Sequence, residues 1–178
     1  MKYIERKTKR IFDITVALFC IVVFSPLYII CYIAIIIDDG RPALFSQERI
    51  GYKGKAFKIH KFRTMRLDAE ESGPQLYNDN DNRLTVVGSF LRRHHLDELP
   101  QMWNVLKGEM SFIGPRPERK YFIDKIMEHD SRYPMLYQLR PGVTSYATLY
   151  NGYTDTMEKM LRRLELDLYY LEHNSLWF

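Results

Sequence analysis

The pattern of apolar and polar positions divides the chain into one long apolar run and a remainder in which charged residues are frequent. No charged residue occurs from Ile14 to Ile37, a run long enough for a membrane-spanning helix. Ser25-Pro26 lies near its middle, and proline kinks or breaks a helix because it removes a backbone donor and clashes with the preceding turn. Each half is then about 17 Å of helix, or about half of a ~30 Å hydrocarbon core. Two alternatives follow: a kinked spanning helix, and a re-entrant hairpin that enters and leaves by the same face.

A β-hairpin is predicted from Leu44 to Met65. Two segments rich in strand-forming residues flank the turn residues Gly51–Gly54. Alternate residues of the second segment share one face. They are two apolar residues followed by two cations, namely Phe57, Ile59, Lys61 and Arg63. This order indicates either a core that opens into an anion site or a strand end with solvated charges.

Helical periodicity accounts for most of the remaining chain. Residues 84–106 predict two helical pieces with a break between them, and residues 121–129 predict a short amphipathic helix. Residues 70–83 are rich in turn-forming types and predict a surface loop. The clearest helix covers residues 155–172, whose apolar stripe is typical of core packing and whose expected N-cap is Thr154. The fold class expected is therefore α+β and mainly helical, with one small hairpin.

Composition and charge separate two parts of the chain. Residues 1–40 hold a basic N-terminus and the apolar run, and residues 41–178 form a globular domain. Cations outnumber acidic residues ahead of the apolar run, whereas the two are nearly balanced after it. A basic excess beside an apolar segment favours anionic lipid headgroups as its partner and argues against a nucleic-acid-binding face. Both cysteines, Cys20 and Cys31, lie in the apolar run, so no disulfide framework is expected.

The segment from His94 to Pro117 carries the clearest chemistry; it reads HHLDELPQMWNVLKGEMSFIGPRP. Its adjacent carboxylates, Asp97 and Glu98, have a structural interpretation in which Asp97 caps the following helix. The alternative is a phosphate-handling site, because Arg92 precedes the pair and Arg116 follows it between two prolines that stiffen its backbone. Arginines bind phosphates, and carboxylates and phosphates can share a divalent cation. Zinc is not expected, because no third ligand cluster has usable spacing.

Several long segments resemble one known family, the bacterial sugar transferases or monotopic phosphoglycosyl transferases. HLDELPQMWNVLKGEMSFIGPRP is similar to the hallmark segment of that family, and QERIGYKGKAFKIHKFRTM is similar to its upstream segment. RPGVTS resembles its downstream segment, and LELDLYYLEHNSLW resembles its C-terminal signature. The proline-broken apolar run resembles its re-entrant membrane anchor. These segments occur in the family's order and cover nearly the whole chain.

The resemblance implies an enzyme that transfers a phosphosugar from a UDP-sugar to polyprenyl (undecaprenyl) phosphate, the initiating step of bacterial surface glycoconjugate and exopolysaccharide synthesis. Asp97 is then the nucleophile that attacks the β-phosphate, which releases UMP and leaves a phosphosugar-aspartyl intermediate. Magnesium is the implied cofactor, held near Asp97 and Glu98. Glu98 is also implied in substrate positioning or proton transfer. The implied phosphate-binding residues are Arg92 and Arg116, with Lys61 and Arg63 as weaker candidates.

The resemblance also bears on topology. The cluster Lys2–Arg10 holds the N-terminus in the cytoplasm, and a spanning helix would carry residues 41–178 away from the nucleotide-sugar. The implied arrangement is a hairpin broken at Ser25 and Pro26, with the catalytic domain on the cytoplasmic face of the bacterial inner membrane and amphipathic helices at the interface. The expected partners are the UDP-sugar, polyprenyl phosphate and inner-membrane lipids, without nucleic acid and with a homo-oligomer left open. The rivals are a non-catalytic membrane-anchored lipid- or anion-binding adaptor and a bitopic protein with an extracytoplasmic domain.

One segment departs from the family pattern. After RPGVTS the family often has a glycine, a tryptophan-alanine-glutamine run and then asparagine-glycine-arginine. Here Tyr146–Tyr153 reads YATLYNGY. Tyr153 stands in place of the arginine, which puts one anion contact of the family in doubt. A different sugar and a different loop are the two alternatives, and no sugar specificity follows.

Overall fold

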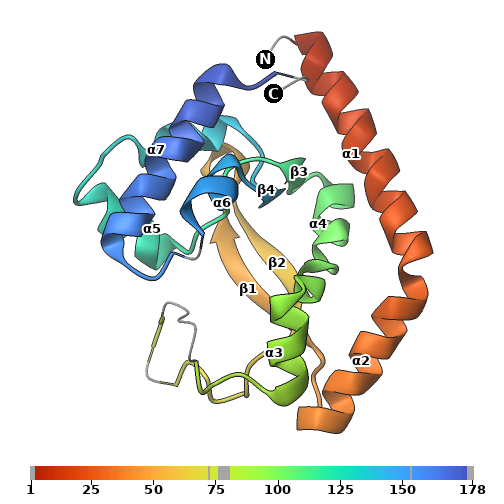
Figure 1. Cartoon of the computed structure of the whole chain (residues 1–178). Helices are drawn as coiled ribbons and strands as arrows, with labels where there is room; N and C mark the ends of the chain where they lie inside the picture. The colour runs from red at the N-terminus through yellow and green to blue at the C-terminus, as the bar shows by residue number, and fades with distance from the viewer. Residues whose placement is uncertain (1–2, 72, 76–80, 153, 176–178) are drawn as a thin grey trace.

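In the computed structural model, which describes residues 3–71, 73–75, 81–152 and 154–175, two consecutive helices form one side of the molecule (Figure 1). They are α1 (Tyr3–Val23) and α2 (Ser25–Asp39), and they meet at an angle of 62°. Pro26 lies in the first turn of α2, where its missing N–H group is not needed for helical hydrogen bonding. The Ser25 hydroxyl donates to the Val22 carbonyl oxygen over 2.8 Å. The predicted break at Ser25-Pro26 is thus confirmed as a bend between two helices.

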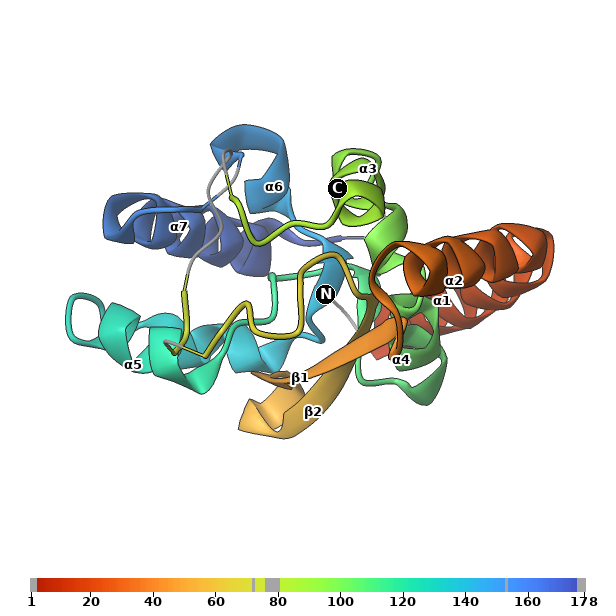
Figure 2. The same cartoon turned by 90° about the horizontal axis from the view of Figure 1, so that it is seen from below.

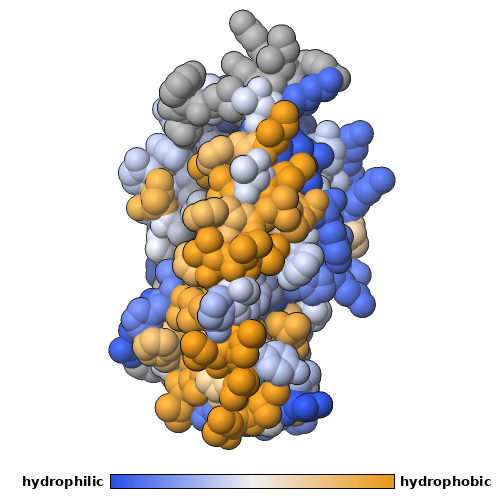
Figure 3. Space-filling model, turned by 90° about the vertical axis from the view of Figure 1, so that its right-hand side faces the viewer, coloured by the Kyte–Doolittle hydropathy of each residue, from blue (hydrophilic) through white to orange (hydrophobic). Residues whose placement is uncertain are grey.

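The outer face of this helix pair is apolar. Val22 and Ile37 expose 70% and 80% of their surface, and several other large apolar residues of α1 and α2 are more than half exposed. Figure 3 shows this face, over which apolar side chains gather along much of the molecule. Among the described helices, none alone has the length and apolarity to cross a membrane, and the bent pair Arg6–Val23 and Ser25–Asp39 meets the criterion only when taken together, by length and composition.

The predicted hairpin is confirmed. Strands β1 (Leu44–Ile50) and β2 (Ala56–Phe62) are antiparallel, with Leu44 opposite Phe62 and Ile50 opposite Ala56. A 3₁₀ turn at Tyr52–Gly54 joins them, and Gly54 has a φ of +70°, which a glycine adopts without strain.

The remaining elements alternate short helices with two very short strands. The helices are α3 (Val86–Arg93), α4 (Gln101–Lys107), α5 (Lys120–Met127), α6 (Tyr146–Asn151) and α7 (Met157–His173). Strands β3 (Ser111–Ile113) and β4 (Gly142–Thr144) pair in parallel, a second small sheet that the sequence pattern did not predict. The chain is therefore α+β and mainly helical, as expected. Of the predicted loop 70–83, residues 72 and 76–80 lie outside the described part.

The expected N-cap of the last helix was wrong by two residues. Thr156 is the N-cap of α7, and its side chain accepts a hydrogen bond from the Lys159 amide. Thr154 instead accepts a hydrogen bond from Arg163 over 3.2 Å. Both threonines have the chemistry of a cap, but Thr154 is engaged by a side chain from the buried face of the helix.

Three apolar clusters hold the elements together. One joins α5 and α7, a second joins α1 to β2 and α4, and a third joins α2 to β2 and α3. In Figure 2, α1 and α2 lie on one side, α5 and α7 lie on the other, and the β1–β2 hairpin runs between them. The segment from α3 to α4, which carries the adjacent carboxylates, lies beside the hairpin and the α1–α2 helix pair.

Candidate active site

A tight turn between α3 and α4 presents the two carboxylates. α3 ends at Arg93 with His94 as its C-cap, and His95 has a φ of +55°, a left-handed conformation that stops the helix. Asp97 and Glu98 follow in a 3₁₀ turn at Leu96–Glu98. The N-cap of α4 is Pro100, and no side chain caps this helix. The interpretation of Asp97 as a helix cap is therefore wrong.

Asp97 and Glu98 differ in how they are held. The Lys61 ammonium donates to Glu98 over 2.6 Å, and the Arg116 guanidinium lies 3.9 Å from the same Glu98 oxygen. Asp97 is 5% exposed and lies 3.8 Å from Lys61. Its side chain makes no hydrogen bond to any residue in the described part of the chain. Glu98 is fixed by a short hydrogen bond and a second cation, whereas Asp97 is held, within the described residues, only by the longer ion pair with Lys61.

The electrostatics of the two acids follow from these contacts. Burial raises the pKa of Asp97, and the nearby Lys61 offsets this only in part. Burial also acts to raise the pKa of Glu98, but the combined attraction of Lys61 and Arg116, with the Lys61 hydrogen bond, outweighs it and holds that pKa below its usual value. Burial lowers the pKa of Lys61, an effect that Glu98 opposes. Lys61 is thus the cation around which the site is built.

The loop that carries Arg116 is positioned by close backbone contacts. A Cβ atom on Gly114 would lie 2.2 Å from the Arg140 carbonyl oxygen, so only glycine fits there. The Arg116 amide donates to the Asp167 carboxylate of α7 over 3.3 Å. Burial is the main cause that raises the pKa of Asp167, to about 6. The side chain of Arg116 is 40% exposed, so its guanidinium can reach a ligand.

The other two predicted cations are placed differently. Arg92 lies in the last turn of α3, close enough for its charge to act on Asp97. Arg63 is buried, and it donates to the carbonyl oxygens of Asp39 and Gly40 over 2.7 Å each. These contacts tie the end of α2 to the end of β2. The structure brings Lys61 and Arg116 to the carboxylates, while phosphate binding by Arg63 stays a prediction.

The carboxylate pair is compatible with magnesium. No group of three or more potential metal-binding side chains occurs among the residues that the structure describes. Magnesium does not need such a group, because it commonly uses one or two carboxylates together with water and substrate phosphates. Asp97 makes no hydrogen bond among the described residues and is the better metal ligand of the pair, because Glu98 already accepts a hydrogen bond from Lys61.

Asp167 and Glu118 support the site, and the sequence pattern predicted neither of them. Glu118 is buried and binds Arg49 over 2.8 Å and Arg163 over 2.5 Å, which joins β1 to α7 directly behind the Arg116 loop. A usable signal existed for Asp167. It lies three positions after Leu164 and so on the apolar face of a helix, where an acid needs a partner.

The divergent segment lies beside α7. Ser145 is the N-cap of α6, and the Tyr146 ring lies 4.8 Å from Tyr150 and 5.5 Å from Tyr169, centroid to centroid. Tyr153 lies outside the described residues. Two tyrosines of the divergent segment, Tyr146 and Tyr150, thus form an aromatic group with Tyr169 of α7.

Fold and site together define a class of protein: a small α+β domain on a bent apolar helix pair, with clustered carboxylates and cations suited to phosphate chemistry. Comparison with known sequences makes the assignment specific, because the model of the bacterial sugar transferase family matches residues 4–178. The chain belongs to the bacterial sugar transferase family.

The relatives have named activities. The chain is 39% identical over 169 residues to a UDP-N-acetylgalactosamine-undecaprenyl-phosphate N-acetylgalactosaminephosphotransferase from Aeromonas hydrophila, covering 95% of this chain and 40% of that protein. It is 38% identical over 177 residues to a UDP-glucose:undecaprenyl-phosphate glucose-1-phosphate transferase from Escherichia coli K12, covering 98% and 38%. A Caulobacter vibrioides protein with the same printed activity is 39% identical over 173 residues, covering 95% and 64%. The chain thus spans between about two fifths and two thirds of the length of these relatives.

Proposed function

We propose that this chain is a phosphoglycosyl transferase that moves a phosphosugar from a UDP-sugar to a polyprenyl phosphate, such as undecaprenyl phosphate, and releases UMP. The relatives that share its family carry such activities in their names. The observation that carries the proposal is the difference between the adjacent acids. Lys61 and Arg116 hold Glu98, while Asp97 has one 3.8 Å ion pair with Lys61 and no hydrogen bond among the described residues. A nucleophile needs a free oxygen, and its neighbours need a fixed geometry.

In the first half-reaction, an Asp97 carboxylate oxygen attacks the β-phosphorus of the UDP-sugar. A new oxygen–phosphorus bond forms, and the bond from that phosphorus to the bridging oxygen breaks. The electron pair leaves on UMP, and the phosphosugar stays on Asp97 as an acyl phosphate.

The surrounding side chains stabilise the charge that moves in this step. Lys61 lies between both carboxylates, and Arg116 presents a planar fork that suits phosphate oxygens. Arg92 adds positive charge at the end of α3. A magnesium ion held by Asp97 and Glu98 would supply further neutralisation of the diphosphate. Glu98 orients Lys61 through their 2.6 Å hydrogen bond.

In the second half-reaction, a phosphate oxygen of the polyprenyl phosphate attacks the same phosphorus. The bond to Asp97 breaks, the carboxylate is restored, and the product is a polyprenyl diphosphate sugar. Because one residue serves both half-reactions, UMP leaves before the lipid reacts.

The proposal includes a monotopic location on the cytoplasmic face of the bacterial inner membrane, with α1 and α2 forming a re-entrant hairpin. Its support is the 62° bend, the exposed apolar face of the pair and the cations in the first part of α1. In addition, Arg10 donates to the Val105 and Leu106 carbonyl oxygens over 2.6 and 2.8 Å. The polar part of α1 is therefore bound to the end of α4 and stays on the side of the domain.

The activity is tested by incubating the purified protein with polyprenyl phosphate, magnesium and a panel of UDP-sugars. UMP release with at least one sugar, dependent on the lipid for turnover, is the expected result. A non-catalytic adaptor would bind the lipid and release no UMP with any member of the panel, which would refute the proposal.

The topology is tested with single cysteines at Lys7 and Glu158, both exposed positions, on a background without Cys20 and Cys31. In intact cells, both should resist an impermeant thiol reagent and react after permeabilisation. Labelling of the Glu158 position alone from outside would show a spanning helix and refute the hairpin.

A further inference from the structure

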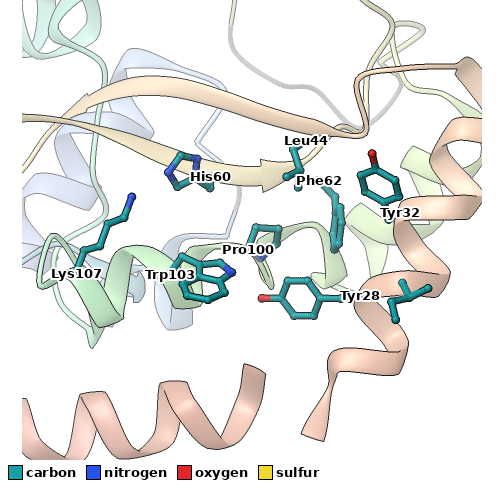
Figure 4. A pocket seen from close by; sticks show the side chains of 9 residues that line it. Tyr28, Tyr32, Leu44, His60, Phe62, Pro100, Trp103 and Lys107 are labelled. Atoms are coloured by element: carbon teal, nitrogen blue, oxygen red, sulfur yellow. The ribbon is translucent and has the colours of Figure 1, made fainter. Parts of the chain in front are cut away.

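A groove of about 520 Å³ lies between α2, the hairpin and α4. Its walls are mainly apolar and aromatic and include Tyr28, Ile29 and Tyr32 from α2, Leu44 and Phe62 from the hairpin, and Trp103 from α4. Figure 4 shows Lys107 and His60 at the end away from Tyr32. The groove is thus apolar along its length and cationic at one end.

The groove is separate from the carboxylate site. Neighbouring residues of a strand point to opposite faces, so His60 and Phe62 face the groove while Lys61 pairs with Glu98 on the other side of β2. The Tyr28 hydroxyl donates to the Leu99 carbonyl oxygen, which closes the wall between α2 and the turn that carries the acids. A molecule in the groove therefore lies behind the reacting carboxylate, across β2 from it.

The mouth of the groove is continuous with the apolar outer face of the helix pair. Ile29 is 60% exposed, and its neighbour one turn on, Ile33, is 50% exposed and belongs to the face proposed to lie in lipid. Trp103 is 51% exposed, although tryptophan side chains are mostly buried on average. The exposed Lys107 at the far end is complementary to an anionic headgroup.

We propose that the groove is a binding site for one acyl chain of an anionic bilayer phospholipid, with the headgroup phosphate at Lys107. The site rests on the proposed membrane location but is distinct from the site of the reacting lipid. A bound chain packs against Pro100 and Phe62, which support the turn of Asp97 and the strand of Lys61. The lipid thereby acts as a structural ligand that stiffens the back of the catalytic site.

The two tryptophans of the chain make the site testable. In a Trp177→Phe variant, Trp103 is the single reporter. In detergent, titration with phosphatidylglycerol brominated in its acyl chains should quench Trp103 with saturation at about one lipid per chain. Quenching that only follows the mole fraction of bromolipid in the micelle, without saturation, would overturn the proposal.

Matched variants locate the lipid. Ile29→Phe narrows the groove and should weaken saturable quenching, whereas Ile33→Phe on the same helix outside the groove should not. Lys107→Gln should weaken binding about fivefold, and Lys58→Gln, at an exposed position outside the groove, should leave it unchanged. Equal effects in either matched pair would overturn the assignment.

Two further arms separate the outcomes. Unlabelled phosphatidylglycerol should displace the bromolipid, and polyprenyl phosphate should not; displacement by polyprenyl phosphate at equal concentration would assign the groove to the acceptor and overturn the proposal. UMP release is measured on the same preparation. Normal release without saturable quenching defeats the groove alone, and saturable quenching without release defeats only the proposed activity.

Discussion

Two buried acidic clusters lie close together in this molecule and have opposite designs. In the cluster around Glu118, both carboxylate oxygens are paired, one with Arg49 and one with Arg163. In the pair at the α3–α4 turn, Glu98 is held by Lys61, while Asp97 has no side-chain hydrogen bond within the described residues. Burial acts to raise the pKa of both Glu118 and Asp97. The charges of Arg163 and Arg49 outweigh the effect of burial on Glu118 and lower its pKa. The pKa of Asp97 stays raised. A fully paired acid stabilises a fold, whereas an acid whose oxygens accept no hydrogen bond from the protein is available for chemistry.

The largest loss of activity, with little change in stability, is expected when the proposed nucleophile Asp97 is replaced. Asp97→Asn keeps the shape but removes the carboxylate, so turnover measured as UMP release should fall by at least about 10⁴-fold. Because the residue has no hydrogen-bonded partner to lose, the free energy of unfolding should change by less than about 1 kcal/mol. Appreciable turnover by this variant would remove Asp97 from the chemistry.

Replacement of Glu118 should chiefly lower the stability of the fold. Glu118→Gln leaves the buried Arg163 and the half-buried Arg49 without their counter-charge, which should destabilise the protein by about 3–5 kcal/mol. Thermal unfolding in detergent measures this, and Asp124→Asn, at an exposed ion pair on α5, is the matched control with little expected effect. An unfolding temperature equal to that of the parent protein would show that the cluster is not structural.

Asp167 should give a pH-dependent stability. Its pKa is raised to about 6 in the folded protein from an ordinary 3.8, so the folded state binds the proton more tightly than the unfolded state. This stabilisation is fully present below about pH 4 and is lost as the pH rises through about 6, amounting to at most about 3 kcal/mol. The unfolding free energy of the parent should therefore decline between pH 4 and 7 relative to Asp167→Asn. Parallel pH profiles for the two proteins would contradict this assignment.

Lys61 connects the two acids of the catalytic pair, so its loss should impair chemistry more than folding. Lys61→Met should lower kcat/KM about 100-fold, since it removes a preorganised cation from the phosphate site. Lys58→Met on the solvent side of the same strand serves as the control. If both variants retained parental kinetics, Lys61 would have only a packing role.

The smallest loss of activity is expected for Arg116→Lys. The charge is retained and the planar fork is lost, so turnover should fall about tenfold. Steady-state kinetics for UDP-sugar measures the loss. Since the backbone amide that binds Asp167 is unchanged, an unfolding temperature that also fell would indicate a structural role for this guanidinium instead.

Local signals predicted much of the fold and part of the site. Proline inside an apolar run predicted the bend at Ser25-Pro26, and turn residues between strand-forming segments predicted the hairpin. The parallel pairing of β3 with β4 was missed because each strand has three residues and their contact is long-range. Lys61 is a weaker candidate than Arg92 and Arg116 on the sequence alone, although it is the cation paired most closely with Glu98. Its partner is 37 positions away, and only tertiary packing brings the two together.

The central claim is that Asp97, and not Glu98, forms the bond to phosphorus. The direct measurement is intact and peptide mass spectrometry after incubation with UDP-sugar and magnesium without lipid acceptor. The expected result is release of at most one equivalent of UMP, a gain in mass of one phosphosugar on a peptide that contains Asp97, and loss of the adduct on addition of polyprenyl phosphate. An adduct on Glu98 would reverse the two roles. Lipid-dependent turnover without any adduct, through a ternary complex of both substrates, would contradict the covalent mechanism.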